Sequence, residues 1–572
     1  MKNNNHNITE KYQKYLDYEN QRFKQLAEQN RKSWADVWEQ SVDKHPEKPI
    51  VYEVGASKPW TYQELDRAAD KIANWAINLN KNKNLNLNLN KNHKYIGVHQ
   101  VNSAVLLATV LGLAKAGITA VLFNVRESEQ KLSTLAKDCG VEINIGKPIP
   151  SLENYDHNSI LSAEWSGRIS PEHRNQITME DAVVIIFTSG TSGRSKPALF
   201  SHRRMIGAGI AWSLRTQMTP ESNCYITLPL YHGNGLAVAF ASCVEAGACA
   251  VVREKFSVRA FLDDVRNYNC DSVVYIGELW RYLANSSQKP DDKDNPLKVI
   301  FGNGLSSGLW ENTIDRFGIE RVVEHFGATE MPASALTNWT GKPGYCGFIP
   351  PNHPNAKNIV LVDEQGKPVP MGEIGQALLR VPGDRYRGYL DSSLDESKIW
   401  ENLLQPGDLW WRSGDLLSRD ADGFFTFIDR MGDTFRWKGE NVACQEVEEA
   451  ILSTGKIREA VVYGVEIPRA SGKVGMASLL PVESNFENNL DEFLNQLKEL
   501  LPPYAIPHII RLVEQHHQTT STMKILKSQL QKQGFKQIDK YPHFILVESK
   551  YVELTKDYLS KLENGELNIG FR

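Results

Sequence analysis

Between Tyr95 and Phe301, short apolar runs alternate with helix-length segments. The first repeat joins the runs Tyr95–Val98 and Ile118–Phe123 through a helical stretch at Ala104–Lys115. Later runs of the same kind are Val183–Phe200, Cys224–Leu230, Ala248–Val252, Ser272–Ile276 and Val299–Phe301. Because parallel strands need a crossover between them, usually a helix, this alternation predicts an α/β architecture with parallel strands.

The pattern changes after about Pro350. The turns Asp363-Glu-Gln-Gly366 and Asp420-Ala-Asp-Gly423 separate strand-like runs, which predicts a small β-rich subdomain at about 351–430. Beyond it, the strand 459–465 lies between the helical segments 446–452 and 490–500.

At 572 residues the chain is too long for a single core. We therefore predict a large N-terminal domain over 1–430, with two α/β subdomains and the β-rich subdomain. A small, mobile α+β C-terminal domain is predicted over 431–572. We expect the hinge near Asp429–Asp433, because Gly432 allows backbone dihedral angles to change at low cost.

Two local patterns stand out near the N-terminus. Thr61-Tyr-Gln-Glu64 fits a capping box and opens a helix with apolar positions at Leu65, Ala68, Ile72 and Ala76. Residues 81–92 (KNKNLNLNLNKN) alternate as a strand does, but asparagine is a poor strand former. We interpret this segment as a surface insertion without a functional role.

The composition argues against several classes of protein, among them nucleic-acid-binding, disulfide-rich and zinc-binding proteins. The chain is 41% hydrophobic and 23% charged with a net charge of −4, so nothing favours a nucleic-acid partner. Its seven cysteines form no Cys-x-x-Cys pair, which argues against a disulfide framework or a zinc site and suits a reducing compartment.

Membrane segments are not predicted. The first 30 residues are polar and lack the apolar core of a signal peptide. The longest apolar stretches, Ala104–Phe123 and Gly235–Val252, are interrupted by Lys115 and Glu245, so we interpret both as buried helix–strand units. We expect a cytoplasmic protein with small-molecule partners, while peripheral membrane contact and the oligomeric state stay open.

The segment Ser189-Gly190-Thr191-Ser192-Gly193-Arg194, with Lys196 close behind, carries the strongest chemical signal. It joins the apolar runs 182–187 and 197–200, so it is expected to be a tight loop between two strands. Glycines let the backbone approach an anion and hydroxyls add donors, so the loop can bind phosphate, although it lacks the Walker A pattern. The alternative is an ordinary hairpin loop.

Further segments combine aromatic, acidic, basic and glycine residues at predicted turns. They are Leu228–Gly235 with Tyr231 and His232, Gly302-Asn303-Gly304, His325-Phe326-Gly327-Ala328-Thr329-Glu330, Arg412–Asp415, Asp429-Arg430 and Thr522–Ile525 with Lys524. Taken singly, each is more often a solvated charge or an ordinary turn than a functional group. Their joint occurrence and order carry the functional signal.

In this order the motifs resemble the adenylate-forming superfamily of acyl-CoA synthetases, luciferases and peptide-synthetase adenylation domains. The sequence is most similar to the fatty acid transport protein and very-long-chain acyl-CoA synthetase family. That narrower resemblance rests on Tyr275–Leu283, Phe301–Leu305, Asp429–Val442, Tyr541–Phe544 and Tyr551-Val552, and it extends from about Trp34 almost to the C-terminus.

The resemblance implies a two-step ligase reaction with ATP, Mg²⁺ and coenzyme A. A fatty acid carboxylate attacks the α-phosphate of ATP, giving an acyl adenylate and pyrophosphate, and the thiol of coenzyme A then displaces AMP. Two alternatives stay open: the same chemistry on a carnitine-like or aryl acid, and a lipid-uptake or lipid-binding protein with weak catalysis.

The resemblance also implies a role for each motif residue. Phosphate contacts fall to Thr188, Ser189, Gly190, Thr191, Ser192, Gly193 and Lys196, with Thr329 at the α-phosphate and Glu330 holding Mg²⁺. The residues implied to contact adenosine are Asn303, Gly304, His325, Phe326, Gly327, Asp415 and Arg430. His232 is implied near the acyl carboxylate, Lys524 at the carboxylate and α-phosphate, and Lys438, Gly439 and Glu440 along coenzyme A.

Four features of the motifs depart from the superfamily pattern. Ser192 stands where threonine is usual, Phe326 stands where tyrosine is commoner, and Arg194 adds a charge next to the phosphate loop. The segment Ser521–Lys524 lacks the glycine that is usual in the wider superfamily, as the transport-protein branch does, and Lys527 is a neighbouring alternative. The hydrophobic N-terminal anchor typical of the animal transport proteins is not seen, which favours a soluble or peripheral enzyme over a transporter.

Overall fold

The computed structural model describes residues 2–82, 95–174, 176–189, 195–305, 307–332, 335–382, 387–431, 434–437, 440–467, 473–519, 525, 527–564 and 566–567. Two compact units divide the chain. The first contains Met1–Val360, Leu378–Ser413 and Ala421–Phe425; the second contains Leu361–Ala377, Gly414–Asp420 and Thr426–Arg572. The predicted domain boundaries and hinge stay predictions, and Gly432 and Asp433 lie outside the described residues.

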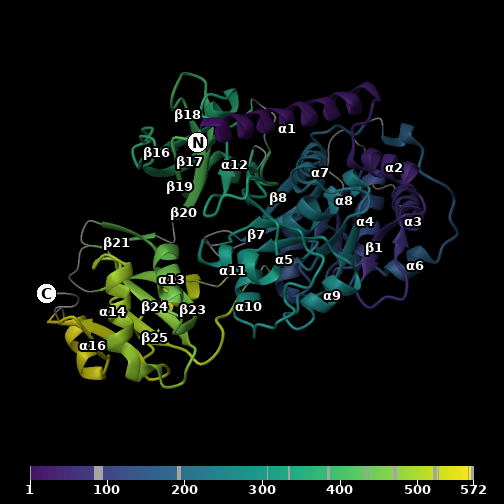
Figure 1. Cartoon of the computed structure of the whole chain (residues 1–572). Coiled ribbons are helices and arrows are strands. Elements are labelled where there is room, and N and C mark those ends of the chain that lie inside the picture. Colours follow the sequence, from purple (N-terminus) through teal and green to yellow (C-terminus); the bar gives the residue numbers. More distant parts are fainter. Residues whose placement is uncertain are drawn as a thin grey trace. The chain divides into compact units, whose positions relative to one another are not determined.

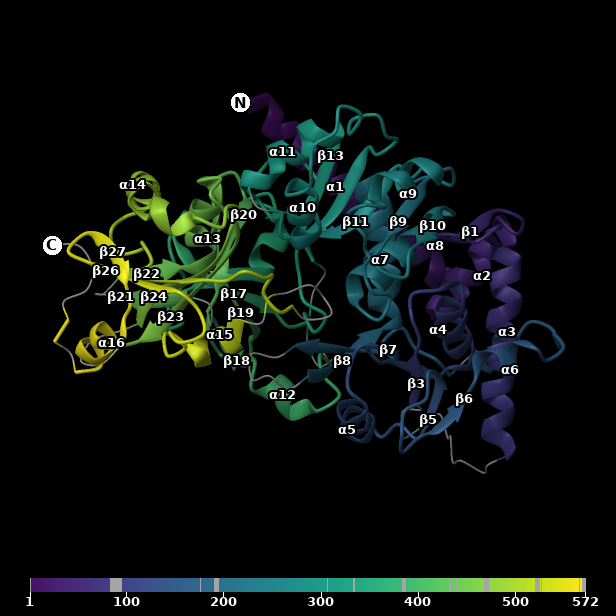
Figure 2. The same cartoon turned by 90° about the horizontal axis from the view of Figure 1, so that it is seen from below.

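Two sheets built largely from parallel strands form the first unit (Figures 1 and 2). The six-stranded sheet has the order β6-β5-β3-β4-β7-β8. Its strands are β3 (Tyr95–His99), β4 (Thr119–Leu122), β5 (Ile143–Gly146), β6 (Glu153–Tyr155), β7 (Ala182–Ser189) and β8 (Ser195–Ser201). Only β7 and β8 pair antiparallel, with Thr188 opposite Lys196, so the predicted phosphate loop joins two adjacent strands.

The eight-stranded sheet has the order β14-β13-β12-β11-β9-β10-β1-β2. Its strands are β1 (Pro49–Glu53), β2 (Trp60–Thr61), β9 (Asn223–Ile226), β10 (Cys249–Val252), β11 (Ser272–Ile276), β12 (Val299–Asn303), β13 (Arg321–Phe326) and β14 (Leu336–Asn338). The neighbours from β1 to β13 along this order pair in parallel, and the two edge strands β2 and β14 pair antiparallel. The predicted α/β fold is confirmed.

Helices of the first unit connect and cover these strands. They are α1 (Lys2–Glu28), α2 (Trp34–Lys44), α3 (Tyr62–Asn82), α4 (Ala104–Ala116), α5 (Glu129–Cys139), α6 (His157–Leu161), α7 (His202–Thr216), α8 (Ala241–Ala246), α9 (Phe261–Asn267), α10 (Gly277–Ala284), α11 (Ser307–Phe317) and α12 (Ser392–Glu396), with a π-helical turn at Asn234–Phe240. The predicted capping box is present, because Glu64 accepts from the Thr61 backbone and Thr61 accepts from the Glu64 backbone. The predicted insertion lies outside the described residues from position 83 onward.

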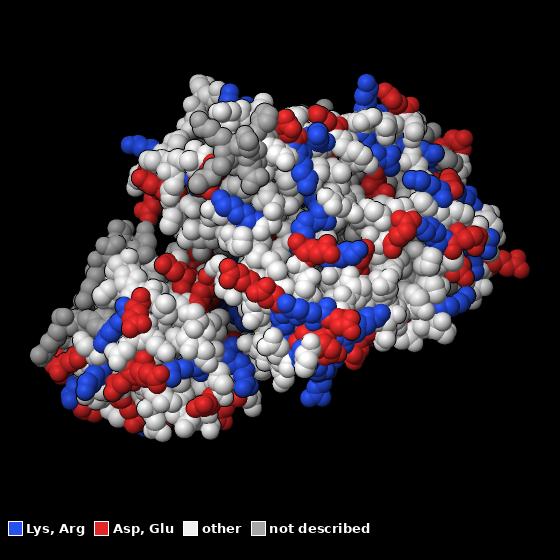
Figure 3. Space-filling model, in the orientation of Figure 1, with Lys and Arg blue, Asp and Glu red and all other residues white. Residues whose placement is uncertain are grey.

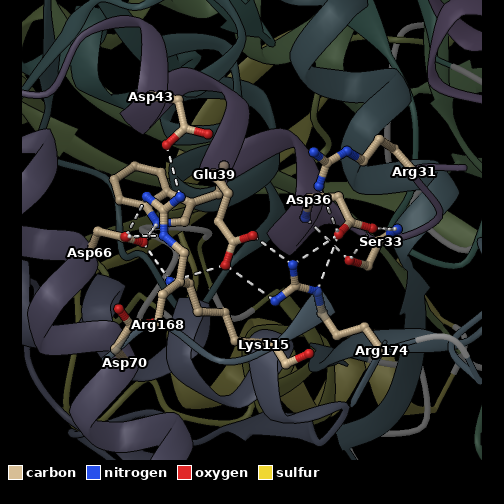
Figure 4. A network of polar contacts seen from close by, with 12 residues as sticks. Arg31, Ser33, Asp36, Glu39, Asp43, Asp66, Asp70, Lys115, Arg168 and Arg174 are labelled. Carbon is tan, nitrogen blue, oxygen red and sulfur yellow. Dashed lines mark hydrogen bonds and ion pairs between the residues drawn. The ribbon is translucent and has the colours of Figure 1, made fainter. Parts of the chain in front are cut away.

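A buried ion-pair network ties α2, α3 and α4 together (Figure 4). The Lys115 side chain is fully buried, and its Nζ lies 2.6 Å from Asp66, 2.6 Å from Asp70 and 3.3 Å from Glu39. Arg174 pairs with the same Glu39 at 2.6 Å. Lys115 is therefore the centre of a paired charge cluster, which explains how a lysine interrupts an otherwise apolar helix.

Helix α1 packs on the first unit, although its sequence is polar. Tyr12, Tyr15 and Leu26 are buried, and Tyr15 meets Trp339 edge to face with ring centroids 5.0 Å apart. Arg22 pairs with Glu245 at 2.7 Å, so the charge that interrupts the second apolar stretch is also partnered. In the described part of the chain, no helix is both long and apolar enough to span a membrane.

The β-rich region has the strand order β15-β20-β19-β17-β16, with β18 against β19. Its strands are β15 (Gly347–Phe348), β16 (Ile359–Val362), β17 (Ile374–Arg380), β18 (Ile399–Glu401), β19 (Leu409–Arg419) and β20 (Phe424–Arg430). On the face of the molecule that Figure 3 shows, positive and negative side chains are interspersed.

In the second unit, a five-stranded sheet has the order β23-β24-β25-β26-β27. Its elements are β23 (Ile457–Glu466), β24 (Lys473–Pro481), β25 (Ile509–Leu512), β26 (His543–Val547), β27 (Lys550–Glu553), α13 (Cys444–Ser453), α14 (Leu490–Leu500), α15 (Lys527–Gln533) and α16 (Lys556–Glu563), besides the hairpin β21 (Thr434–Trp437) and β22 (Glu440–Ala443). The predicted helix–strand–helix order of this region is confirmed.

Candidate active site

The candidate site of the first unit is built at the carboxyl ends of parallel strands. Asn303 ends β12, and His325 and Phe326 end the neighbouring β13. The turn Leu228–Gly235 follows β9 in the same sheet. Open α/β sheets bind ligands outside this edge, so the sheet topology brings these predicted segments to the place where a nucleotide is expected.

Glycines allow two backbone segments to touch at this edge. A Cβ atom on Gly277 would lie 1.8 Å from the Gly304 carbonyl oxygen, and one on Gly302 would lie 2.0 Å from the Tyr275 carbonyl oxygen. Gly304 also has a φ of +84°, which favours glycine. The 302–304 turn therefore requires glycine for its contact with the β11–α10 junction.

Glu324 holds the 302–305 turn in place. Its carboxylate accepts from the backbone N–H of Gly304 at 3.1 Å and of Leu305 at 2.9 Å, and from the Tyr275 hydroxyl. The side chain is buried, and this burial raises its pKa to about 7 although the three hydrogen bonds oppose the shift. Sequence reasoning missed Glu324; the signal was a glutamate within the apolar run Val322–Phe326.

His325 supports the same turn from its other side. Burial lowers the pKa of His325 to about 4, so the ring is neutral near pH 7 and its Nδ1 donates to the Gly302 carbonyl at 2.6 Å. The ring also meets Trp212 edge to face at 4.9 Å. Phe326 beside it is buried.

Asparagine side chains link the turns around His232. Asn102 donates to the carbonyl of Leu228 at 2.9 Å and accepts from the N–H of Leu230 at 2.8 Å. Asn234 donates to Oδ1 of Asn303 at 2.7 Å, which joins the His232 turn to the predicted adenine-binding turn.

The segment that contains Thr329 adjoins the His232 turn. A Cβ atom on Gly233 would lie 3.8 Å from Oγ1 of Thr329, so the two turns are neighbours. Arg204, on α7, donates to the carbonyls of Ala328 and Thr329 and thereby fixes the backbone before Glu330. A Cβ atom on Gly327 would lie only 3.1 Å from Cβ of Ala335, so glycine at position 327 allows these two segments to lie close together.

Glu330 is buried and paired with a cation. Its Oε1 accepts from the Tyr389 hydroxyl at 2.7 Å and from Nζ of Lys398 at 3.1 Å. Burial alone would raise the pKa of Glu330, but the Lys398 charge and the Tyr389 hydrogen bond outweigh it and hold the pKa below its ordinary value. Glu330 is thus an ionised carboxylate.

The strand ends of the predicted phosphate loop reach the same place. Thr188 lies opposite Lys196 across β7 and β8, and Nζ of Lys196 lies 5.8 Å from the centroid of the Tyr389 ring. Gly190, Thr191, Ser192, Gly193 and Arg194 lie outside the described residues, and Ser189 is described by its backbone alone. The structure therefore brings together Lys196, Glu330 and two residues that the sequence did not suggest, Tyr389 and Lys398.

Other predicted site residues belong to the second unit. Asp415 lies on β19, and Nε of Arg430, at the end of β20, is 3.5 Å from its Oδ1. Asp429 accepts from the N–H groups of Cys444 and Gln445 at the start of α13. Glu440 begins β22 opposite Trp437, while Lys438, Gly439 and Lys524 lie outside the described residues.

A magnesium ion fits the donor set around Glu330. Mg²⁺ is commonly held by one or two carboxylates together with substrate phosphates. Among the described residues, no group of three or more His, Cys, Asp and Glu side chains is arranged to hold a metal. Phosphate oxygens would accordingly complete the coordination beside Glu330.

Comparison with models of known protein families identifies the family of the chain. Residues 38–390 match the model of the AMP-binding enzyme family, and residues 446–523 match that of the AMP-binding enzyme C-terminal domain. The chain belongs to the AMP-binding enzyme family. Enzymes of this adenylate-forming type use ATP with Mg²⁺, and coenzyme A as co-substrate in the ligases.

Among curated relatives of this AMP-binding enzyme, human long-chain fatty acid transport protein 1 is 31% identical over 542 residues, covering 87% of this chain and 82% of the relative. Human long-chain fatty acid transport protein 6 is 31% identical over 572 residues, covering 92% and 90%. The chain is thus an adenylate-forming enzyme of the acyl-CoA ligase superfamily, with fatty acid transport proteins as relatives.

Solved structures show the same fold at lower identity. The anthranilate CoA ligase structure with anthranoyl-AMP has a TM-score of 0.74 and 18% identity, covering 87% of this chain and 96% of that one. O-succinylbenzoate coenzyme A synthetase from Bacillus subtilis, with ATP and a magnesium ion, has a TM-score of 0.70 and 21% identity, covering 86% and 98%.

Proposed function

We propose that this AMP-binding enzyme activates a long- or very-long-chain fatty acid to acyl-AMP and then to acyl-CoA, with release of pyrophosphate and AMP. The observation that carries the proposal is the 31% identity to long-chain fatty acid transport protein 1 over 87% of the chain. The gathering of Lys196, Glu330, Tyr389 and Lys398 supports it, because a polyphosphate site needs fixed cations around an acidic metal ligand.

In the first step, an oxygen of the acid attacks the α-phosphorus of ATP, a P–O bond forms, and pyrophosphate departs with the electrons of the broken bond. Two anions approach each other, so the residues act by positioning and by charge. Glu330 would hold Mg²⁺, which screens the phosphate charges, while Lys196 and Thr188 contact the β- and γ-phosphates. Thr329 contacts the α-phosphate, and Lys524 binds the attacking carboxylate and the α-phosphate together.

The base and ribose are assigned to the turns described above. Phe326 offers its ring face to adenine, and the backbone at Asn303, Gly304, His325 and Gly327 lines that pocket. Asp415 accepts from the ribose hydroxyls, with Arg430 beside it.

In the second step, the thiol of coenzyme A attacks the acyl carbon, and AMP departs as the leaving group. We assign Lys438, Gly439 and Glu440 to the path of the pantetheine arm, with His232 close to the acyl carbon. The withdrawal of Lys524 between the steps, by rotation about Asp429–Asp433, remains part of this proposal. So does the predicted location in the cytoplasm, with peripheral membrane contact open.

A panel of acids tests the proposal. Purified protein is incubated with ATP, Mg²⁺, coenzyme A and C8 to C24 fatty acids, with benzoate, anthranilate and carnitine as the competing substrate classes. We expect AMP and pyrophosphate release to be highest with long chains. Release with the aryl acid or carnitine alone would assign another substrate, and no AMP with any acid would favour a lipid-binding protein.

A further inference from the structure

Lys398 touches the predicted metal ligand, although no sequence motif includes it. It lies between α12 and β18, and its Nζ is 3.1 Å from Oε1 of Glu330. The side chain is 24% exposed and that of Glu330 is 12% exposed, so the pair is partly shielded from water. A shielded ion pair at a nucleotide site keeps much of its strength.

Two aromatic rings hold the Lys398 ammonium independently of Glu330. Nζ lies 4.9 Å from the ring of Trp411 and 5.7 Å from the ring of Tyr389. Trp411 is fully buried on β19, and the neighbouring backbone is fixed because the Lys398 carbonyl accepts from Arg412 at 2.8 Å. Cation–π attraction therefore keeps a positive charge at this position even when the carboxylate is otherwise engaged.

A second ammonium shares the same ring. Lys196 lies over Tyr389 at 5.8 Å, and the Tyr389 hydroxyl itself donates to Glu330. Two lysines thus lie against the ring of one tyrosine beside a buried carboxylate. This arrangement fits a ligand with several negative charges, such as a polyphosphate chain.

We propose that Lys398 is a polyphosphate-binding residue that exchanges partners. In the free protein it neutralises Glu330, and when the metal–nucleotide engages that carboxylate, the ammonium turns to an oxygen of the β- or γ-phosphate. The exchange is needed because a divalent cation and an ammonium compete for the same carboxylate oxygens. This inference rests on the proposed function, since it assumes that ATP binds at Glu330.

Ligands of different phosphate content test the assignment. The affinities of the full-length protein for ATP, pyrophosphate and AMP are measured with Mg²⁺ by calorimetry, for the wild type and Lys398→Met. We expect ATP and pyrophosphate to bind roughly 10- to 100-fold more weakly to the variant, as for a lost charge-assisted hydrogen bond. AMP, which lacks the outer phosphates, should bind with unchanged affinity.

The chain offers a matched control. Lys342 also lies over two rings, 4.3 Å from that of Tyr345 and 4.2 Å from that of Phe424, and neither ring belongs to the group formed by Lys196, Glu330, Tyr389 and Lys398. Lys342→Met should leave all three affinities unchanged. Lys398→Arg, which keeps the charge, should restore most of the ATP affinity, and Lys398→Gln replaces the methionine variant if that one does not fold.

The exchange itself is tested with Glu330→Gln in a double-mutant cycle. The two substitutions should be coupled in the melting temperature of the free protein. They should also be non-additive in the affinity for magnesium pyrophosphate, because the pair is present before binding and broken after it. Equal affinities of wild type and Lys398→Met for ATP, or equal losses for ATP and AMP, would overturn the role of Lys398. A wild-type protein that binds no ATP would instead overturn the proposed function.

Discussion

Replacing Glu324 by glutamine tests whether a buried carboxylate shapes the predicted adenine-binding turn. The carboxylate accepts three hydrogen bonds, from the N–H groups of Gly304 and Leu305 and from the Tyr275 hydroxyl. Glutamine offers one accepting oxygen, and its amide N–H would face a backbone donor. A lost hydrogen bond to a charged acceptor costs about 1.5–3 kcal/mol, so we expect the turn to loosen and ATP to bind roughly 3- to 10-fold more weakly.

The pH dependence of stability gives a second, independent measure of the environment of Glu324, namely the free energy that its ionisation costs. Burial raises the pKa of Glu324 from 4.5 to about 7, which means that ionisation inside the protein costs about 3 kcal/mol. Since the folded-state pKa is the higher one, the contribution to stability is complete below pH 4.5 and is lost as the pH rises through 7. Glutamine does not ionise, so the variant lacks this loss.

The assay compares melting temperatures of wild type and Glu324→Gln between pH 5 and pH 8.5. Between pH 5 and pH 8.5, the melting temperature of Glu324→Gln should rise by a few degrees relative to that of the wild type, because the wild type loses about 3 kcal/mol of stability as Glu324 ionises. Tyr275→Phe serves as a control, because removing a hydrogen bond that favours the ionised form should shift the transition of the otherwise intact carboxyl to higher pH. Parallel curves for wild type and Glu324→Gln would refute the reasoning.

Two further predictions concern catalysis and stability. Lys524→Ala should abolish acid-dependent pyrophosphate exchange while calorimetry still detects ATP binding. The control Lys527→Ala, which removes the partner of Glu448, should retain exchange. Unchanged exchange in Lys524→Ala would exclude the role assigned to Lys524. Lys115→Met leaves three buried carboxylates without their shared cation and should destabilise the protein by about 3–5 kcal/mol in denaturant titrations. Lys131→Met, at a partly exposed ion pair with Glu127, should change stability by less than about 1 kcal/mol. Equal effects of the two substitutions would contradict a buried-charge origin.

The fold was predictable because its strands are short and buried on both faces. Runs such as Ala182–Phe187 and Ser272–Ile276 became β7 and β11, since continuous apolar runs between turns are typical of parallel sheets. Helix α14 began and ended at the predicted residues, Leu490 and Leu500. Local pattern was sufficient wherever burial decided the conformation.

Other features depended on contacts between distant residues. Helix α1 is polar on average, and its packing rests on a few side chains such as Tyr12 and Leu26, which average hydropathy does not reveal. Lys398 and Tyr389 are far along the chain from Glu330, so no spacing rule connects them. The structure supplies these pairs because the segment before α12 and β18 runs beside β8, where Ala198 bridges to Tyr389.

Two glutamates on β13 and its following turn show why residue type alone did not define the site. Glu330 has a neighbouring ammonium, so it stays ionised, and in the proposed function it exchanges that cation for a metal. The partners of Glu324 among the described residues are neutral: two backbone N–H groups and a tyrosine hydroxyl. Ionisation of this carboxyl is therefore unfavourable, as its raised pKa indicates, and its role is to fix the turn. The same side chain is therefore an electrostatic ligand in one place and a positioning group in the other, and the presence of a cation decides between the two roles.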